Sequence, residues 1–301
     1  MTSAADVTSD AKPVGFIGLG VMGAPMCRNL ARKAARPVIG FDTSTAALEP
    51  LRAFGVAAAG SIAALARECA IVFMALPGGR DVEAVCLGPD GLLAAVAPPT
   101  IVVDLGTSPV DLTRALAARF AEKGVRYADA PIARTRQAAE DGTLSIMVGG
   151  DEATFAEISP LLATFASDIT HCGAVGSGQV VKIMNNMVLV ETAVALSEAV
   201  AIARRAGVEG RVLFETLMKG SADSFALRNH AMKAILPGHF PERAFSTDYA
   251  RKDLSYALAL AAANGVAAPG AAVADGLLQK ASESGYGALY WPVVSRVIDQ
   301  E

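Results

Sequence analysis

The segment Val14-Gly-Phe-Ile-Gly18-Leu-Gly20-Val-Met-Gly23 decides the fold of this chain. Its first four residues suit a buried strand, and three glycines in the spacing GxGxxG lead from that strand into a helical stretch. Gly18 permits a sharp turn, Gly20 lets a pyrophosphate approach the backbone, and Gly23 lets helix and strand pack closely. This context predicts a dinucleotide-binding turn, with a tight turn that holds no ligand as the alternative. The predicted turn comprises Gly18, Leu19, Gly20, Val21, Met22 and Gly23.

Short apolar strands alternate with helical segments from Pro13 to about residue 174. Unbroken apolar runs are typical of parallel strands that are covered on both faces. Ser108-Pro109 and Gly124 supply the start and stop signals of one intervening helix, with Ser108 as its cap. We predict four of the strands at Val14–Ile17, Val38–Phe41, Ile71–Met74 and Ile101–Asp104.

Strand-like runs end near residue 178, and helical patterns continue from there. We expect a long helix over residues 179–206 that joins two halves, with Gly207 as its stop signal. Further helices are expected over residues 211–219, 247–263, 271–284 and 291–298. The predicted fold class is α/β. It comprises an N-terminal Rossmann-type doubly wound sheet, residues 13–174, plus a C-terminal all-α domain, residues 175–301, joined by the long helix.

Composition excludes several classes of protein. With 52% hydrophobic and 19% charged residues the chain can bury large cores, and a net charge of −4 argues against nucleic acid as the main partner. The uncharged stretch 254–274 is interrupted by Asn264-Gly265 and Pro269-Gly270, so no membrane span is expected. We interpret residues 1–12 as a loose tail rather than a signal peptide. The scattered cysteines and histidines predict no disulfide framework and no metal site, and favour the cytoplasm.

Asp42 stands at the end of the second predicted strand, about twenty residues beyond the glycine motif. A carboxylate at this position accepts hydrogen bonds from both ribose hydroxyls and repels a 2′-phosphate, so NAD is favoured over NADP. The alternative is that Asp42, followed by Thr43 and Ser44, only caps the next helix.

Two later strand ends face the same side of a doubly wound sheet, where ligands collect. Leu76 and Pro77 follow the third predicted strand, and Thr107 follows the fourth. Thr107 is suited to hydrogen bonding near a nicotinamide, or it belongs with Ser108 to the cap of the next helix. The residue types and their spacing favour neither role.

Lys182 and Asn186 lie at i and i+4 near the start of the long predicted helix, which puts them on one face. A lysine beside amides at a domain junction is suited to proton transfer, whereas a solvent-facing lysine is the ordinary alternative.

The sequence resembles the β-hydroxyacid dehydrogenases over nearly its whole length. The resemblance rests on GFIGLGVMGAPM, Asp104-Leu-Gly-Thr107, Asp129-Ala-Pro131 followed by the segment 142–150, the segment 173–186, and Lys252-Asp253-Leu254. It implies that Lys182 is the catalytic acid/base, that Asn186 holds substrate, and that Thr107 and Lys252 lie beside nicotinamide and substrate. It also implies a small hydroxy acid or semialdehyde as substrate and a homodimer or homotetramer. A lysine base needs a pKa below its ordinary ~10.4, and burial or a nearby cation acts in that direction.

One turn departs from the family pattern. Most members carry Ser-Gly-Gly where this chain has Ala133-Arg134-Thr135. A guanidinium and a hydroxyl suit an anionic group, and the pair is similar to that of sulfolactaldehyde reductase, so a sulfonate substrate is the alternative to a 3-hydroxy acid. Arg134 in an ordinary surface ion pair is the competing interpretation.

Three alternatives are weighed against a β-hydroxyacid dehydrogenase. Lys182 argues against an imine reductase, and Lys182, Asn186 and Lys252 together argue against a non-catalytic scaffold. 6-Phosphogluconate dehydrogenase resembles the N-terminal half but has a longer helical part. We expect His171 and Trp291 to be structural residues.

Overall fold

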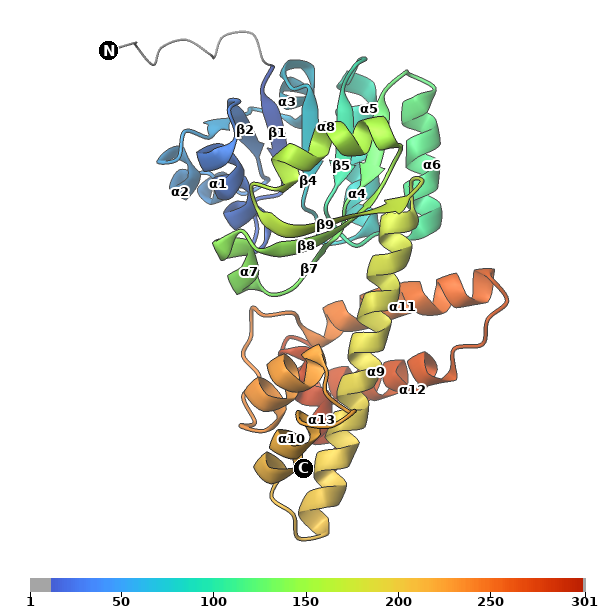
Figure 1. Ribbon diagram of the computed structural model, residues 1–301. Helices are drawn as coiled ribbons and strands as arrows, with labels where there is room; N and C mark the ends of the chain where they lie inside the picture. Colours follow the sequence, from blue (N-terminus) through green and yellow to red (C-terminus); the bar gives the residue numbers. More distant parts are fainter. Residues whose placement is uncertain (1–11, 300–301) are drawn as a thin grey trace. The chain divides into compact units, whose positions relative to one another are not determined.

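The computed structural model describes residues 12–299 (Figure 1). The chain divides into two compact units, Met1–Lys182 and Ile183–Glu301. The division falls inside one long helix, α9 (Ser177–Arg205), a little after the domain boundary expected at residue 174. The expected N-terminal tail lies outside the described residues except for Lys12.

The first unit contains a nine-stranded sheet with the order β3-β2-β1-β4-β5-β6-β8-β7, and β9 pairs with β8. Strands β1 to β6 run parallel, whereas β8 is antiparallel to both β6 and β7. The four predicted strands are confirmed. The strands are β1 (Val14–Ile17), β2 (Val38–Phe41), β3 (Ala57–Ala58), β4 (Ile71–Met74), β5 (Ile101–Asp104), β6 (Arg126–Asp129), β7 (Ile132–Ala133), β8 (Leu144–Gly149) and β9 (Ala166–Gly173).

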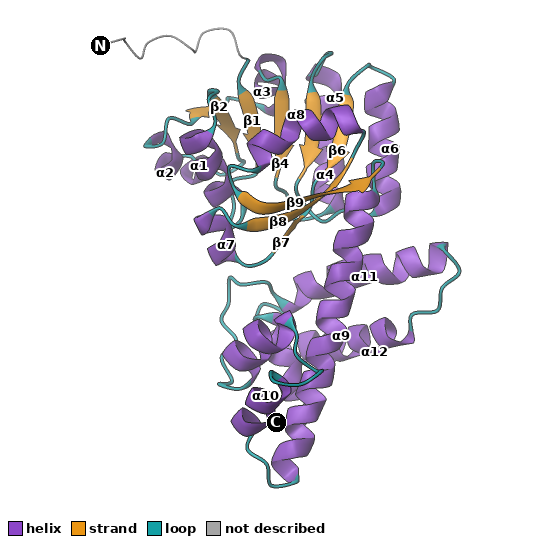
Figure 2. Ribbon diagram, in the orientation of Figure 1, coloured by secondary structure: helices purple, strands orange, loops and turns teal. Residues whose placement is uncertain are grey.

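Helices cover both faces of this sheet (Figure 2). Successive residues of one strand pack in different cores, since Phe16 belongs to one cluster of buried side chains and Ile17 to the other. Two cores explain why the strands are unbroken apolar runs. The helices are α1 (Gly23–Lys33), α2 (Glu49–Arg52), α3 (Ile62–Glu68), α4 (Gly79–Leu87), α5 (Leu92–Ala95), α6 (Val110–Ala121), α7 (Arg136–Asp141) and α8 (Glu152–Leu162).

The helix cap predicted at Ser108 is wrong. Helix α6 begins after Pro109 without a side-chain cap, and the Ser108 hydroxyl donates instead to Asp104 Oδ2 at 2.7 Å. A charge-assisted hydrogen bond holds this hydroxyl at the buried carboxylate, and Ser108 lies two residues before Val110, the first residue of α6. The stop signal at Gly124 is confirmed, because this residue adopts a φ of 69° after the last turn.

The second unit is helical, as predicted. Helix α11 (Thr247–Ala263) has the predicted bounds. The helix expected over residues 271–284 ends in a π-type turn, and the helix expected over residues 291–298 begins as a 3-10 turn. A wide helix of π type over Leu227–Ile235 was not predicted. The elements after α9 are α10 (Gly210–Leu217), Leu227–Ile235, α11 (Thr247–Ala263), α12 (Pro269–Ala281), a second π-type turn at Ser282–Tyr286, a 3-10 turn at Trp291–Val293, and α13 (Val294–Asp299).

Helix α9 is long and apolar enough to cross a membrane by length and composition alone. Half of its most apolar window is buried inside the protein, which is the pattern of a helix that packs within a fold.

Candidate active site

Two glycines of the GxGxxG turn are required by the packing of the protein itself. Gly18 has a φ of 88°, and a Cβ atom there would collide with the carbonyl oxygen of Ala75. A Cβ atom at Gly23 would collide with the carbonyl oxygen of Gly18. The turn from β1 into α1 therefore exists only with glycine at these two positions.

Gly20 is different, because a Cβ atom there would meet no protein atom within 4 Å. The first turn of α1 contains no acidic residue, and Met22 at its start makes no side-chain cap. A helix start with open space above it and no competing carboxylate fits a pyrophosphate. The residues of the turn thus fit the phosphates of a dinucleotide.

Asp42 joins the end of β2 to the glycine-rich turn. Its Oδ2 accepts the backbone N–H of Leu19 at 2.7 Å, and its Oδ1 accepts that of Ser44 at 2.8 Å. The contact with Ser44 is a local turn of the Asx type rather than a helix cap. Each carboxylate oxygen keeps further acceptor capacity, which is what ribose hydroxyls require.

The loops after β4 and β5 lie at the same edge of the sheet, because parallel strands end together there. Leu76 is half-buried and Pro77 is exposed. Thr107 is 7% exposed, and it takes no part in capping α6, which starts three residues later. Of its two expected roles, the helix cap is excluded.

The first turn of α9 is held by the buried carboxylate of Asp129. One oxygen accepts the backbone N–H of Gly176 at 2.6 Å, and the other accepts that of Gln179 at 2.7 Å. Burial raises the pKa of Asp129 from 3.8 to about 6, although hydrogen bonds from the backbone act in the opposite direction.

This raised pKa makes stability depend on pH with a definite sign. The folded protein holds the Asp129 proton more tightly than the unfolded chain, so the stabilisation is complete below pH 3.8 and lost as the pH rises through about 6. We expect the free energy of unfolding of the wild type, relative to Asp129→Asn, to increase by up to about 3 kcal/mol from pH 7 to pH 4. Urea unfolding at several pH values measures this difference, and a pH-independent difference would contradict the assignment.

Lys182 is buried, with 9% of its surface exposed, and lies in the second turn of α9. The solvent-facing alternative therefore does not apply. Asn186 follows one helical turn later and is 5% exposed, and its Nδ2 donates to Asp253 Oδ2 at 2.7 Å. The predicted lysine and amide thus lie on a buried face of the helix.

Lys252 lies in the second unit on α11, where its Nζ is 3.1 Å from Asp253 Oδ1 and 3.9 Å from the ring centroid of Tyr249. Asp253 is 2% exposed and contacts both Asn186 and Lys252. Asp253 is a site residue that the sequence pattern does not single out, although Lys252-Asp253-Leu254 belongs to the family resemblance. A carboxylate that sits between two candidate site residues is a signal visible only in the structure.

The turn at residues 133–135 does not support the anion-binding expectation. Arg134 Nη1 donates to the Thr143 carbonyl at 2.6 Å and to Ser167 Oγ at 2.8 Å, and Nη2 pairs with Asp168 at 2.7 Å. The guanidinium is thus bound to other groups of the protein, which agrees with the interpretation of Arg134 as part of a surface ion pair. Ala133 lies in β7, and Thr135 caps α7 by accepting the N–H of Ala138.

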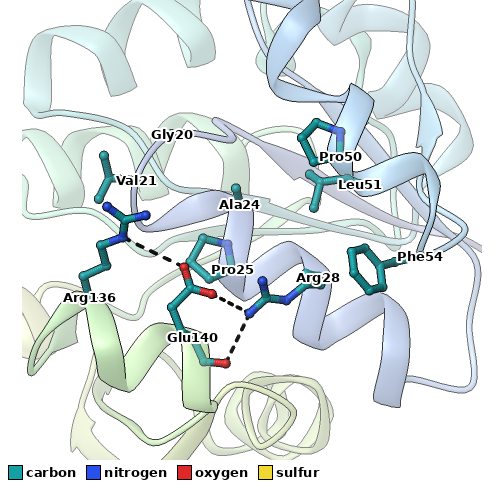
Figure 3. A pocket seen from close by; sticks show the side chains of 10 residues that line it. All are labelled: Gly20, Val21, Ala24, Pro25, Arg28, Pro50, Leu51, Phe54, Arg136 and Glu140. Atoms are coloured by element: carbon teal, nitrogen blue, oxygen red, sulfur yellow. Dashed lines mark hydrogen bonds and ion pairs between the residues drawn. The ribbon is translucent and has the colours of Figure 1, made fainter.

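A cavity of about 200 Å³ adjoins the glycine-rich turn (Figure 3). Arg28 pairs there with Glu140 at 2.6 Å, and its guanidinium lies 6.0 Å from the ring centroid of Phe54. Thr107 and Lys182 are not among the residues that line it. The lining consists of Gly20, Val21, Ala24, Pro25, Arg28, Pro50, Leu51, Phe54, Arg136 and Glu140.

His171 and Trp291, the two residues expected to be structural, both pack within the protein. His171 Nε2 contacts the Gly150 carbonyl at 2.7 Å and its ring stacks on Phe155, and Trp291 is fully buried. Within residues 12–299 no cluster of three or more His, Cys, Asp or Glu side chains is arranged to hold a metal.

Two protein families together match most of the chain. Residues 13–173 match the NAD binding domain of 6-phosphogluconate dehydrogenase. Residues 176–290 match the family described as NAD-binding of NADP-dependent 3-hydroxyisobutyrate dehydrogenase. The order of the two matches is that of the two predicted domains.

Individual relatives match over nearly their full length. The 2-(hydroxymethyl)glutarate dehydrogenase of Eubacterium barkeri is 35% identical over 287 residues, 95% of each chain. The NAD-dependent L-serine dehydrogenase of Pseudomonas aeruginosa is 33% identical, over 96% of this chain and 98% of the relative. The structure of Mycobacterium tuberculosis 3-hydroxyisobutyrate dehydrogenase with L-serine superimposes with a TM-score of 0.87 at 32% identity, covering 96% of this chain and 99% of the other. The chain therefore belongs to the β-hydroxyacid dehydrogenase family, the NAD(P)-dependent enzymes that include 3-hydroxyisobutyrate dehydrogenase.

Proposed function

We propose that the protein interconverts a small 3-hydroxy acid and its semialdehyde with NAD, and that Lys182 is the general acid/base. The observation that carries the proposal is the burial of Lys182 on the helical face that it shares with Asn186. A buried lysine beside a held amide is suited to proton transfer, which a solvated surface lysine is not.

The substrate class follows from what the relatives' names have in common. 2-(Hydroxymethyl)glutarate, L-serine and 3-hydroxyisobutyrate each carry a primary alcohol on the carbon next to the one that bears the carboxylate. They differ in the further substituent on the carbon that bears the carboxylate. We infer that this chain acts on a 3-hydroxypropionate with a substituent at carbon 2.

Each residue has a defined task in this reaction. Bound NAD supplies the hydride acceptor for oxidation. The glycine-rich turn and Asp42 hold the dinucleotide, with Leu76, Pro77, Thr107 and Lys252 as further proposed contacts. Lys182 Nζ removes the hydroxyl proton in oxidation and returns a proton to the carbonyl oxygen in reduction. Asn186, fixed by Asp253, presents its amide to the substrate.

Initial rates with a panel of substrates test this proposal. The panel contains 3-hydroxyisobutyrate, 2-(hydroxymethyl)glutarate, L-serine, tartronate semialdehyde and sulfolactaldehyde, each with both nicotinamide cofactors. We expect at least one of the three primary alcohols to be oxidised with NAD, and oxidation of none of them would contradict the proposal. Sulfolactaldehyde as the fastest substrate in reduction would overturn the proposed substrate class.

Arg134 provides a second check on the substrate. Because its guanidinium is bound to Thr143, Ser167 and Asp168, we expect Arg134→Gly to change the KM for a 3-hydroxy acid less than ~3-fold. Glycine also suits the φ of 85° at this position. A KM that rises tenfold or more, measured by steady-state kinetics, would show that Arg134 binds the substrate anion after all.

The choice of cofactor depends on Asp42. We expect kcat/KM for NAD to exceed that for NADP by at least ~10-fold, because a carboxylate repels the 2′-phosphate. Asp42→Asn removes this repulsion and keeps one of the two acceptor oxygens, so the preference should shrink. Equal or better use of NADP by the wild type would contradict the role of Asp42.

We further propose that the chain acts as a homodimer or homotetramer in the cytoplasm. Val188 and Ile202 of α9 are 57% and 68% exposed, and exposed apolar side chains on one long helix favour contact with a second copy. Light scattering tests the assembly, and a single-chain mass at micromolar concentration would refute it.

A further inference from the structure

The loop after β5 is held from its own strand by Asp104. Its Oδ1 accepts the backbone N–H of Gly106 at 2.8 Å, and its Oδ2 accepts the Ser108 hydroxyl at 2.7 Å. Asp104 is fully buried, so both contacts are shielded from water. Thr107, the proposed nicotinamide neighbour, lies between the two held residues.

The same loop is held from α9 by the side chain of Gln179. Its Oε1 accepts the backbone N–H of Ser108 at 3.0 Å, and its Nε2 donates to the Gly106 carbonyl at 2.9 Å. One carboxamide thus pairs with the C=O and N–H of residues i and i+2, as a peptide group of a neighbouring strand would. Gln179 is fully buried, so no water competes for these groups.

The backbone of Gln179 is fixed independently of its side chain. Its N–H donates to Asp129 Oδ2 at 2.7 Å, which anchors the first turn of α9 to the end of β6. Lys182 lies three residues further along the helix, on the same side as Gln179. The amide of Gln179 therefore connects the loop that carries Thr107 with the helix that carries Lys182.

We propose that Gln179 is a positioning residue, which holds Thr107 and Lys182 in a fixed relation through its two bonds to the 105–108 loop. The inference rests on the proposed function, since it assigns these two residues to one reaction. Gln179 itself touches neither reacting group. Its contribution is to keep the loop in the geometry that hydride and proton transfer require.

Two substitutions test the hydrogen bonds of Gln179: one removes both, and the other keeps only the acceptor. Gln179→Met keeps the length of the side chain and removes both hydrogen bonds, which leaves the Ser108 N–H and the Gly106 carbonyl without these partners. Gln179→Glu keeps an acceptor for Ser108 but sets a carboxylate oxygen against the Gly106 carbonyl. Gln279→Glu, the same change at an exposed position of α12, is the matched control.

The experiment measures amide hydrogen exchange of residues 105–108, the NAD dissociation constant, kcat and KM for each full-length variant. We expect Gln179→Met to accelerate exchange at Ser108 by ~10-fold, the equivalent of one lost hydrogen bond. In both Gln179 variants kcat should fall by ~10- to 100-fold while NAD affinity changes less than ~3-fold. The control should match the wild type in all four quantities.

The outcomes distinguish the inference from the proposed function. Unchanged exchange at Ser108 in Gln179→Met, or an unchanged kcat in both variants, overturns the inference. A loss of NAD affinity in parallel with kcat also overturns it, because that indicates a general structural role. If the wild type oxidises no 3-hydroxy acid, the proposed function fails, and the exchange result alone decides whether Gln179 fixes the loop.

Discussion

Lys182→Ala is expected to lower kcat by a hundredfold or more while NAD still binds. Removal of a general acid/base costs ~10²- to 10⁴-fold, and Lys182 does not line the cavity beside the glycine-rich turn that we propose binds the dinucleotide. Steady-state kinetics with a 3-hydroxy acid measure kcat, and NAD titration measures binding.

Two further variants make the role of Lys182 specific. Lys182→Arg keeps a cation but cannot release a proton near neutral pH, so its kcat should be as low as that of Lys182→Ala. Lys280→Ala, at an exposed position of α12, should behave like the wild type. Wild-type turnover in Lys182→Ala would refute the proton-transfer role. An active Lys182→Arg would show that only the positive charge of Lys182 is needed.

Gly20→Val is expected to abolish useful NAD binding without unfolding the protein. A Cβ atom at Gly20 meets no protein atom within 4 Å, so we expect the fold to tolerate a side chain that fills the space above the start of α1. Loss of two hydrogen bonds to a charged group, at ~1.5 kcal/mol each, weakens binding by about a hundredfold.

The measurement pairs an NAD titration with a thermal unfolding curve. We expect the dissociation constant to rise while Tm stays within a few degrees of the wild type. Gly276→Ala is the control, because it also adds a side chain where no protein atom lies within 4 Å, but in α12 of the second unit. Unchanged NAD affinity in Gly20→Val would place the pyrophosphate elsewhere.

Much of the fold could be predicted because its signals are local. The central strands are buried on both faces, so each is an uninterrupted apolar run with clear ends. Helix α11 has the predicted bounds because Ser246 caps its start by accepting the Tyr249 N–H, and Asn264-Gly265 ends it. The wide helix over Leu227–Ile235 could not be predicted in this way, because its winding departs from the 3.6-residue period that patterns reveal.

The site could be predicted in part. The glycine motif is recognisable because one tight turn fixes the spacing of its glycines, and Asp42 because helix α1 and strand β2 fix its distance along the chain from that turn. The contacts of Arg134 could not be foreseen, because its partner Asp168 lies in β9, a partly exposed strand, 34 residues further along the chain. The role of Gln179 depends on a loop some seventy residues earlier, and no local pattern encodes that pairing.

The shared carboxylate of Asp253 has a consequence for redesign of the enzyme. Because one acidic side chain receives both the amide of Asn186 and the ammonium of Lys252, a replacement at any member of this trio changes the surroundings of the other two. Libraries that aim at new substrates should therefore keep the trio intact or vary its three members together.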